Sequence, residues 1–295
     1  MWFKNLAIYQ FTGQVVHKAE TLDKHLREAL FQPCARLAPM SQGWHAPIGE
    51  NEDAPLAHET SNCSLLCLRK EEKIIPPAAL KEQVQNAVDK FEREDGRKPG
   101  RNEKQRMRDD VYFSMLPQAF TKSTYTYAYI DADLKCLIID SPNANKAEEF
   151  CSFLRNSLGS LKVEPLDNTH VKEQLTSWIN GGDLPENFGV LDNAVLDMNN
   201  EENGKVRYQH HDLFGDDVKL QLKDGAQASQ LAMSYLGQIT FSLQYDYIFK
   251  QLKFLDVIKE QAEEAFAETP EQRFDTDFTI MASSVREMLK GLLPN

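Results

Sequence analysis

The chain has 295 residues, of which 41% are apolar and 26% charged, a balance that excludes a disordered chain of low hydrophobicity. At roughly 150 residues per domain, this length fits two domains or one elongated domain with a projecting arm. The formal net charge of −12 and the isoelectric point near 5.1 disfavour a nucleic-acid partner, unless the cations are gathered on one face.

The first third of the chain predicts two strands and a helix. Residues 2–11 mix aromatic and aliphatic side chains, as a strand buried on both faces does, and the spacing of Leu22, Leu26 and Leu30 predicts a helix. Residues 64–68 predict a second strand that leads into the charged string 69–73. The Pro76-Pro77 pair then marks a boundary.

Residues 78–117 predict a polar helical hairpin. Leu80, Val84 and Val88 give the first helix a single narrow apolar stripe, and Gly96 ends it. After a turn at residues 99–100, a second polar helix is expected with Asn102 as its N-cap, running to Pro117. Two helices with so little apolar surface are expected to form an antiparallel pair that projects from the body.

The rest of the chain predicts mixed strands and helices, and hence an α+β fold. Residues 123–130 and 134–140 read as strands, and residues 145–158 as a helix ended by Gly159. Residues 181–185 form a loop and a second boundary, before strands at 205–211, 230–236, 238–245 and 249–254 and helices at 256–268 and 279–293. We therefore expect four segments: 1–76 and 118–182 as the two parts of a central body, 77–117 as a projecting helical hairpin, and 183–295 as a C-terminal α+β base.

The cysteines and the N-terminus favour a cytoplasmic protein. The five cysteines form an odd set without a disulfide-dense pattern, so reduced thiols are expected at Cys34, Cys63, Cys67, Cys136 and Cys151. No secretory leader opens the chain, and no run approaches the roughly 18 apolar residues that span a bilayer.

Catalytic motifs are absent from the sequence. It contains no nucleophile elbow, no dinucleotide fingerprint, no phosphate-binding P-loop and no H-E-x-x-H metal motif. Cys63 and Cys67 would lie about 13 Å apart on a strand, too far for one zinc ion, so they are interpreted as core residues. We expect no enzyme activity, cofactor or metal. The alternative is a metal-dependent phosphoryl-transfer site that uses Asp140 or the pair Asp275 and Asp277. Otherwise Asp140 reads as the end of a buried strand, and the pair reads as a cap and a solvated carboxylate in a loop before a helix.

Positive charge is concentrated in one segment. Residues 97–108 contain six cations and one carboxylate, Glu103, so that twelve residues of an acidic protein carry a net charge of +5. Such a segment fits a surface that follows a phosphate backbone, or else the solvated hairpin of a purely structural interaction protein. The six cations are Arg97, Lys98, Arg101, Lys104, Arg106 and Arg108, and a weaker cationic cluster comprises Lys205, Arg207, His210 and His211.

Five collinear segments carry a family resemblance over almost the whole chain. They are residues 1–6 (Met-Trp-Phe-Lys-Asn-Leu), 69–76, 116–120 (Leu-Pro-Gln-Ala-Phe), 154–161 and 273–278 (Arg-Phe-Asp-Thr-Asp-Phe), supported by residues 212–213 and 252–254. In this order and spacing they resemble the RdgC family of bacterial recombination-associated proteins.

The resemblance implies a non-catalytic DNA-binding protein of the cytoplasm and nucleoid. A horseshoe-shaped subunit is expected to pair into a ring-shaped homodimer whose basic hole admits double-stranded DNA, with single-stranded DNA as a weaker partner. Binding without sequence preference is expected to inhibit the recombinase RecA, with a role in replication as a secondary expectation.

The resemblance also assigns roles to individual residues. Phe120 matches the aromatic residue that closes the ring and engages DNA, and the neighbouring Lys122 joins the two cationic clusters as a predicted DNA contact. The family usually places a basic residue and glutamine before Asp-Leu, whereas this chain has His210 and His211 there. Histidine is mostly uncharged at neutral pH, so this contact is expected to depend on pH.

Overall fold

The computed structural model describes residues 1–49, 53–199, 204–264 and 267–293, and it confirms the predicted α+β class. Contacts divide the chain into two compact units. The body unit comprises residues 1–28, 46–66 and 126–295, and the hairpin unit comprises residues 29–45 and 67–125. The boundaries predicted at 76/77 and 117/118 fall inside the hairpin unit, and the one at 182/183 falls inside the body unit.

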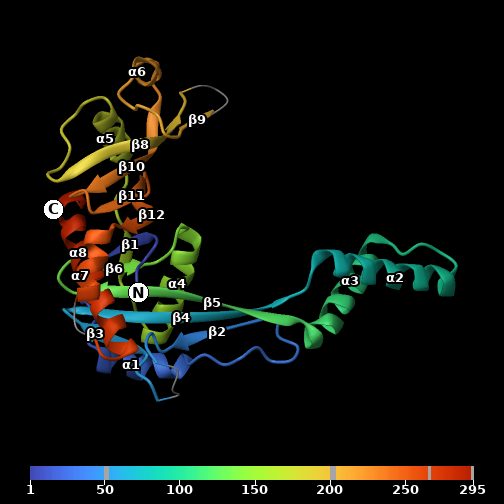
Figure 1. The fold of residues 1–295 in the computed structure, drawn as a ribbon. Helices are drawn as coiled ribbons and strands as arrows, with labels where there is room; N and C mark the ends of the chain where they lie inside the picture. Colours follow the sequence, from blue (N-terminus) through green and yellow to red (C-terminus); the bar gives the residue numbers. More distant parts are fainter. Residues whose placement is uncertain (50–52, 200–203, 265–266, 294–295) are drawn as a thin grey trace. The chain divides into compact units, whose positions relative to one another are not determined.

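An antiparallel sheet forms the centre of the body unit (Figure 1). Two short strands lie off its main path: β7 (Val163–Pro165) pairs with β1, and β3 (Ala57–Thr60) pairs with β4 (Cys63–Ile74). The order of the main strands is β5 (Phe120–Asp131), β6 (Cys136–Ile139), β1 (Leu6–Phe11), β12 (Ile248–Phe254), β11 (Ile239–Gln244), β10 (Gln227–Tyr235), β8 (Phe188–Asp197) and β9 (Lys205–Tyr208).

Helix α8 packs on one face of this sheet, whereas α4 packs on the other face of β1, beside Tyr9. The core joins Phe278, Met281 and Val285 of α8 to strand residues such as Met233 and Phe249, and Figure 1 shows α8 beside β10, β11 and β12. In α4, Asn143 caps the N-terminus, and Gly159 adopts the left-handed φ of +74° that ends the helix. The body helices are α1 (Ala19–Leu26), α4 (Ala144–Leu158), α5 (Val171–Ile179), α6 (Asp216–Lys223), α7 (Asp256–Glu264) and α8 (Pro270–Leu292).

Two local predictions about helix starts are wrong because the caps lie elsewhere. Helix α8 begins at Pro270 rather than at 279, since Thr269 and Gln272 form a capping box. Residues 275 and 277 are therefore helical and do not form a loop. The second hairpin helix begins at Arg101, with Gly100 as N-cap rather than Asn102, because the carboxylate of Glu103 accepts a hydrogen bond from the Gly100 N–H at 2.8 Å.

The strand part of the hairpin unit contains β2 (Met40–His45), which pairs with the second half of β4, while β5 lies on the other side of β4. The guanidinium of Arg69 lies 4.1 Å above the ring of Phe31 and 5.7 Å from that of Tyr125. Glu71 is buried and accepts a hydrogen bond from the N–H of Cys34, and this bond lowers the pKa of Glu71. These contacts explain why the charged string after residue 68 continues the strand instead of ending it.

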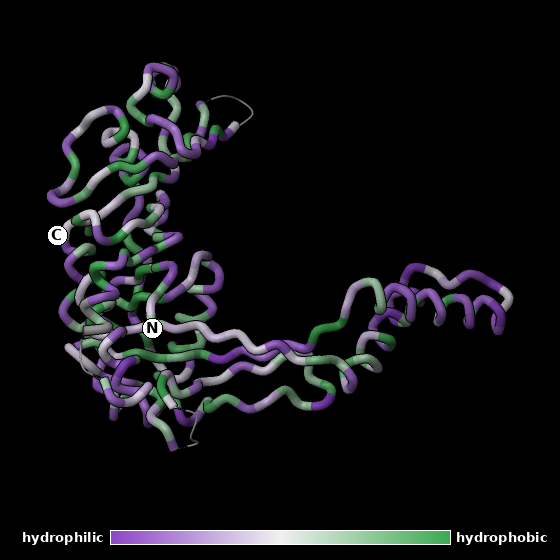
Figure 2. Tube along the Cα trace, viewed as in Figure 1, coloured by the Kyte–Doolittle hydropathy of each residue, from purple (hydrophilic) through white to green (hydrophobic). Residues whose placement is uncertain are grey.

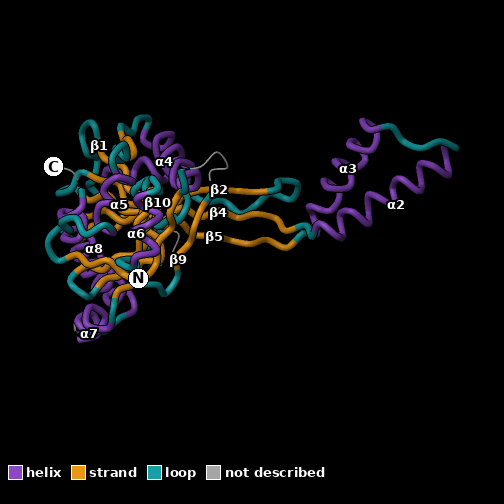
Figure 3. Tube along the Cα trace, turned by 90° about the horizontal axis from the view of Figure 1, so that it is seen from above, coloured by secondary structure: helices purple, strands orange, loops and turns teal. Residues whose placement is uncertain are grey.

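Helices α2 (Pro77–Asp95) and α3 (Arg101–Met115) form the predicted hairpin, and the short 3₁₀ helix η2 (Leu116–Gln118) follows. The two helices diverge as they leave the strands (Figure 3) and are predominantly hydrophilic (Figure 2). Gly96 ends α2 with a φ of +70°, as expected. Val84 and Val88 are the buried residues of α2, and α3 has none.

All five cysteines are free thiols, in agreement with the prediction of reduced cysteines. Cys63 and Cys67 are both buried in the core, as predicted. Burial raises the pKa of Cys63, Cys136 and Cys151 to about 12, which keeps these thiols protonated. No helix among the described residues is long and apolar enough to cross a membrane.

Arg286 of α8 binds the turn after β5 through a buried ion pair. Its Nε donates to the carboxylate of Asp131 at 2.7 Å, and Asp131 is fully buried. The other guanidinium nitrogens contact Asp133 at 2.7 Å, the carbonyl of Ser61 at 2.9 Å and the Sγ of Cys63 at 3.0 Å. One side chain therefore connects the last helix to two separate turns of the body.

We expect Arg286→Met to lower the free energy of unfolding by about 3 kcal/mol, because it leaves the Asp131 carboxylate buried without its cation. Urea denaturation measures this loss. The control is Lys290→Met, which removes an exposed pair with Glu287 and should cost less than about 1 kcal/mol. Equal losses in the two variants would contradict the assignment.

Candidate nucleic-acid interface

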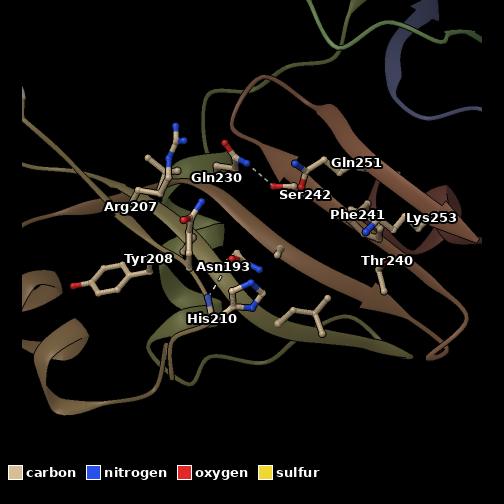
Figure 4. A pocket seen from close by; sticks show the side chains of 15 residues that line it. Asn193, Arg207, Tyr208, His210, Gln230, Thr240, Phe241, Ser242, Gln251 and Lys253 are labelled. Carbon is tan, nitrogen blue, oxygen red and sulfur yellow. Dashed lines mark hydrogen bonds between the residues drawn. The ribbon is translucent and has the colours of Figure 1, made fainter. Parts of the chain in front are cut away.

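The polar face of β8 to β12 carries a hollow of about 500 Å³, which we call the sheet-face hollow (Figure 4). Successive strand residues point to opposite faces of a sheet. Leu231, Met233 and Leu243 belong to the core, while Gln230 and Ser242 line the hollow. The alternation that builds the core therefore also builds a polar surface on the other side.

The lining of this hollow is suited to a polyanion. Arg207 on β9 and Lys253 on β12 lie on opposite sides of it (Figure 4). Amide and hydroxyl groups lie between them, with Gln230 Nε2 donating to Ser242 Oγ at 2.7 Å. The residues described as lining the hollow include these two permanent cations and no carboxylate. Charge-assisted hydrogen bonds from arginine and lysine are the strongest that a phosphate oxygen can accept.

The two histidines take different positions. His210 lines the hollow, with its Nδ1 3.0 Å from the Asp192 carboxylate. His211 stacks on Tyr208 and places its Nε2 2.8 Å from Asp217 on α6. The hydrogen bond from His211 lowers the pKa of Asp217. The two residues are adjacent in sequence, but only His210 is placed to face a ligand in the hollow.

Lys205 is on the same strand as Arg207 but outside the hollow. Its Nζ lies 3.3 Å from the carboxylate of Asp197, which also accepts hydrogen bonds from Lys172 and Ser229. The predicted cluster at 205–211 is therefore divided: Arg207 and His210 line the hollow, whereas Lys205 and His211 lie outside it. His210 also contacts the carboxylate of Asp192, as Lys205 and His211 contact Asp197 and Asp217.

Arg97 is the one member of the hairpin cluster with carboxylate partners among the described residues. Its guanidinium forms two hydrogen bonds with Glu103, at 2.7 and 2.8 Å, lies 3.8 Å from Asp95 and stacks over Phe91. The Arg97 hydrogen bond and the Gly100 N–H together lower the pKa of Glu103 to about 2. Arg97 therefore organises the turn between the helices, and its charge is largely neutralised there.

The other hairpin cations are exposed and, within the described chain, have no carboxylate within ion-pair distance. Three of them line a groove between α2 and α3 of about 470 Å³, which we call the hairpin groove. Five of the six cations are therefore exposed without a carboxylate partner among the described residues, and their role as DNA contacts stays a prediction. The groove cations are Arg101, Lys104 and Arg108, and the remaining two are Lys98 and Arg106.

Phe120 begins β5 in the hairpin unit and is 85% exposed, so it is not a core residue. Strands β4 and β5 are neighbours, and the hydroxyl of Thr124 donates to the carbonyl of Lys70. Because the two strands run in opposite directions, Ile74 at the end of β4 lies near Phe120 at the start of β5. Ile74 is 47% exposed, and Phe113 of α3 is 53% exposed. The predicted DNA contact Lys122 is also exposed. The surface thus offers apolar anchors beside cations.

Several lining residues had no functional role predicted from the sequence pattern. Lys253, Gln251 and Gln230 contribute to the hollow, and Lys81 contributes to the groove. The alternation in residues 249–254 places the exposed Gln251 and Lys253 around the buried Leu252 and could have indicated a polar face there. No sequence pattern marks Lys81 as a groove residue, because it lines the groove only through the position of α3 beside α2.

The candidate metal residues are engaged in other contacts. The carboxylate of Asp140 accepts hydrogen bonds from the N–H groups of Lys4 and Asn5, and burial raises its pKa. Asp275 lies 2.6 Å from His58, and Asp277 pairs with the amino group of Met1 at 2.7 Å. Among the described residues, no three histidine, cysteine or carboxylate side chains are grouped as metal ligands.

Comparison with known proteins decides the family. A family model described as "Putative exonuclease, RdgC" matches residues 1–294. The chain is 34% identical to the recombination-associated protein RdgC of Yersinia enterocolitica over 294 residues, covering 99% of this chain and 97% of the relative. The protein of the same name from Yersinia pestis shows the same identity and coverage. The chain belongs to the RdgC family. Its five motifs therefore reflect common ancestry with these recombination-associated proteins.

Proposed function

We propose that this RdgC-family protein binds DNA without sequence preference in bacterial recombination. The proposal rests on the sheet-face hollow, which Arg207 and Lys253 line together with uncharged polar groups and no carboxylate. This lining contrasts with the net charge of −12 of the whole chain. A permanent cation placed against a phosphate releases condensed counterions whatever the base sequence. The exposed hairpin cations extend the same chemistry to the second unit.

Duplex DNA is the proposed main ligand, with single-stranded DNA as a weaker one. The proposed assembly is a ring-shaped homodimer of horseshoe-shaped subunits, whose basic hole admits the duplex. Acidic residues elsewhere would repel DNA from the outside of the ring. Such a protein would inhibit RecA by occupying the DNA that the recombinase needs, and would act on the nucleoid in the cytoplasm.

The proposal assigns binding and no catalytic step. The family description includes an exonuclease, but the carboxylates that the sequence offered for metal binding make structural contacts instead. Incubation of end-labelled linear duplex with the protein and Mg²⁺ or Mn²⁺ tests this directly. Full-length label supports binding alone, whereas progressive shortening would establish a nuclease.

We expect DNA affinity to depend steeply on salt. If about 5 to 8 phosphates are neutralised, the slope of log affinity against log salt on duplex DNA should be roughly −4 to −7. Filter binding at several salt concentrations and with two unrelated sequences measures the slope and the sequence preference.

The matched variants for the salt experiment are Arg207→Gln and Lys253→Gln, each of which should make the slope shallower by about 1. Lys290→Gln on α8 is the control and should leave the slope unchanged. A slope near zero, or a strong preference for one sequence, would refute electrostatic binding by this surface.

We expect Phe120→Ala to weaken the homodimer by about 1 to 3 kcal/mol, because an exposed aromatic anchor of an interface is removed. The fold should survive, with the free energy of unfolding changed by less than about 0.5 kcal/mol. Analytical ultracentrifugation and urea denaturation measure the two quantities. The contrasting variant is Phe150→Ala in the core of the body, which should cost about 3 to 5 kcal/mol of stability. An unchanged dimer, or broad unfolding of Phe120→Ala, would contradict the assignment.

We expect His210→Gln to change DNA affinity by a modest factor, because His210 lines the hollow but its Nδ1 already lies 3.0 Å from the Asp192 carboxylate. His211→Gln should change DNA affinity less, since the ring of His211 contacts Asp217 on α6. Filter binding at one fixed salt concentration measures both variants. Equal affinities of wild type and His210→Gln would show that His210 does not contact DNA.

A further inference from the structure

The hairpin groove combines an apolar floor with a cationic rim. Leu80 and Val84 of α2 line it together with four cations: Lys81 of α2 and Arg101, Lys104 and Arg108 of α3. The three α3 cations lie three or four residues apart and therefore on one helical face. Lys81 places a further positive charge on the α2 side.

Helices α2 and α3 bury few of their own residues. Only Val84 and Val88 of α2 are buried, and no residue of α3 is buried. Helices of globular proteins gain most of their stability by packing an apolar face against a neighbour. The groove lies between α2 and α3, where a further helix would add the missing apolar contacts.

The rim charges are available to a ligand. Arg97, at the turn of the same hairpin, is neutralised by Glu103 and Asp95. The four rim cations are exposed, and among the described residues none of them has a carboxylate within ion-pair distance. An occupant of the groove therefore has to supply both negative charge and apolar side chains.

We propose that the hairpin groove binds an acidic amphipathic helix of a partner protein, with its apolar residues on Leu80 and Val84 and its carboxylates on Lys81, Arg101, Lys104 and Arg108. Helix-in-groove recognition uses apolar anchors at positions i, i+3 or i+4, and i+7. A DNA backbone satisfies the cations but has no apolar group for the floor. A second copy of the same groove, related by a two-fold axis, would bring the cations against one another.

Arg101, Lys104 and Arg108 would bind either the partner helix or DNA, whereas Leu80 would serve only the partner helix. The partner helix and DNA should therefore compete for the hairpin, while the sheet-face hollow continues to hold DNA.

The test uses the full chain and a fluorescein-labelled peptide of about 18 residues, long enough to form a helix, with leucines at helical spacing and glutamates elsewhere. A second peptide keeps the glutamates and replaces every leucine by glutamine. Fluorescence anisotropy should show that the leucine peptide binds at least about tenfold more tightly than the glutamine peptide, as expected for an apolar anchor. Unlabelled duplex DNA should displace part of the bound peptide.

Matched variants separate the floor from the rim. Leu80→Gln keeps a similar helix propensity. It should lower the affinity for the leucine peptide about tenfold and change the affinity for DNA less than about twofold. Lys104→Gln should lower the affinity for both ligands, and Lys90→Gln, outside the groove, should lower neither affinity. Circular dichroism checks that each variant is folded.

The possible outcomes are distinct. Equal affinity for the two peptides, or a Leu80→Gln variant that binds the leucine peptide like wild type, would overturn the proposal and leave the groove as a phosphate surface. Loss of dimer in Leu80→Gln without peptide binding by wild type would also overturn it and assign the groove to self-association. Peptide binding without any DNA binding would refute the proposed function and leave this inference intact.

Discussion

Alternation of side chains along β8 to β12 is the constraint on which the rest of the body unit depends. One face of these strands has to be covered, and the aromatic and aliphatic residues of α8 cover it. The other face is then composed of the residues in between, among them Gln230, Ser242 and Lys253. A one-residue shift in register would exchange the two sets of side chains and destroy the core and the hollow together. Core stability and the candidate DNA surface are therefore two consequences of one pattern.

Local ion pairs determine which cations can reach a ligand. Lys205 and Arg207 have the same charge and lie two residues apart, but Lys205 contacts Asp197 while Arg207 lines the hollow. In the hairpin, Arg97 is bound by Glu103, whereas Arg101, Lys104 and Arg108 face the groove. Counting charges in a segment therefore overstates the surface available to phosphate. Cations such as Lys205 and Arg97 are lost to that surface because carboxylates of this acidic chain bind them.

The hairpin unit has a different balance of forces. Its strand part is held by Arg69 between two aromatic rings and by the buried Glu71, while its helices bury very few residues. Exposed apolar residues at Phe120, Phe113 and Ile74 occur in this unit, as does the apolar floor of the groove. Apolar surface of this kind in a sparsely packed unit is typical of an interface. The two surfaces fit different partners: Phe120 fits a second copy of the chain, and the groove fits an acidic helix.

The α+β class, the polar helical hairpin, the end of its first helix at Gly96, the helix that Gly159 ends and the family could all be predicted from the sequence, because glycine stops, periodicity and collinear motifs are local signals. It grouped Lys205, Arg207, His210 and His211 as one cluster, but it could not show that Arg207 and His210 line the hollow or that Lys205, His210 and His211 each lie beside a carboxylate. In the hairpin it likewise could not separate Arg97, which pairs with Glu103, from the cations that line the groove. It placed α8 nine residues late and read Asp275 and Asp277 as a loop, although His58 and the Met1 amino group are their partners. Which side chains meet across strands and helices is visible only in the folded chain, where Lys253 lines the same hollow as Arg207 and Lys81 the same groove as Lys104. Such pairings depend on register and packing between distant segments, which no local pattern of residues encodes.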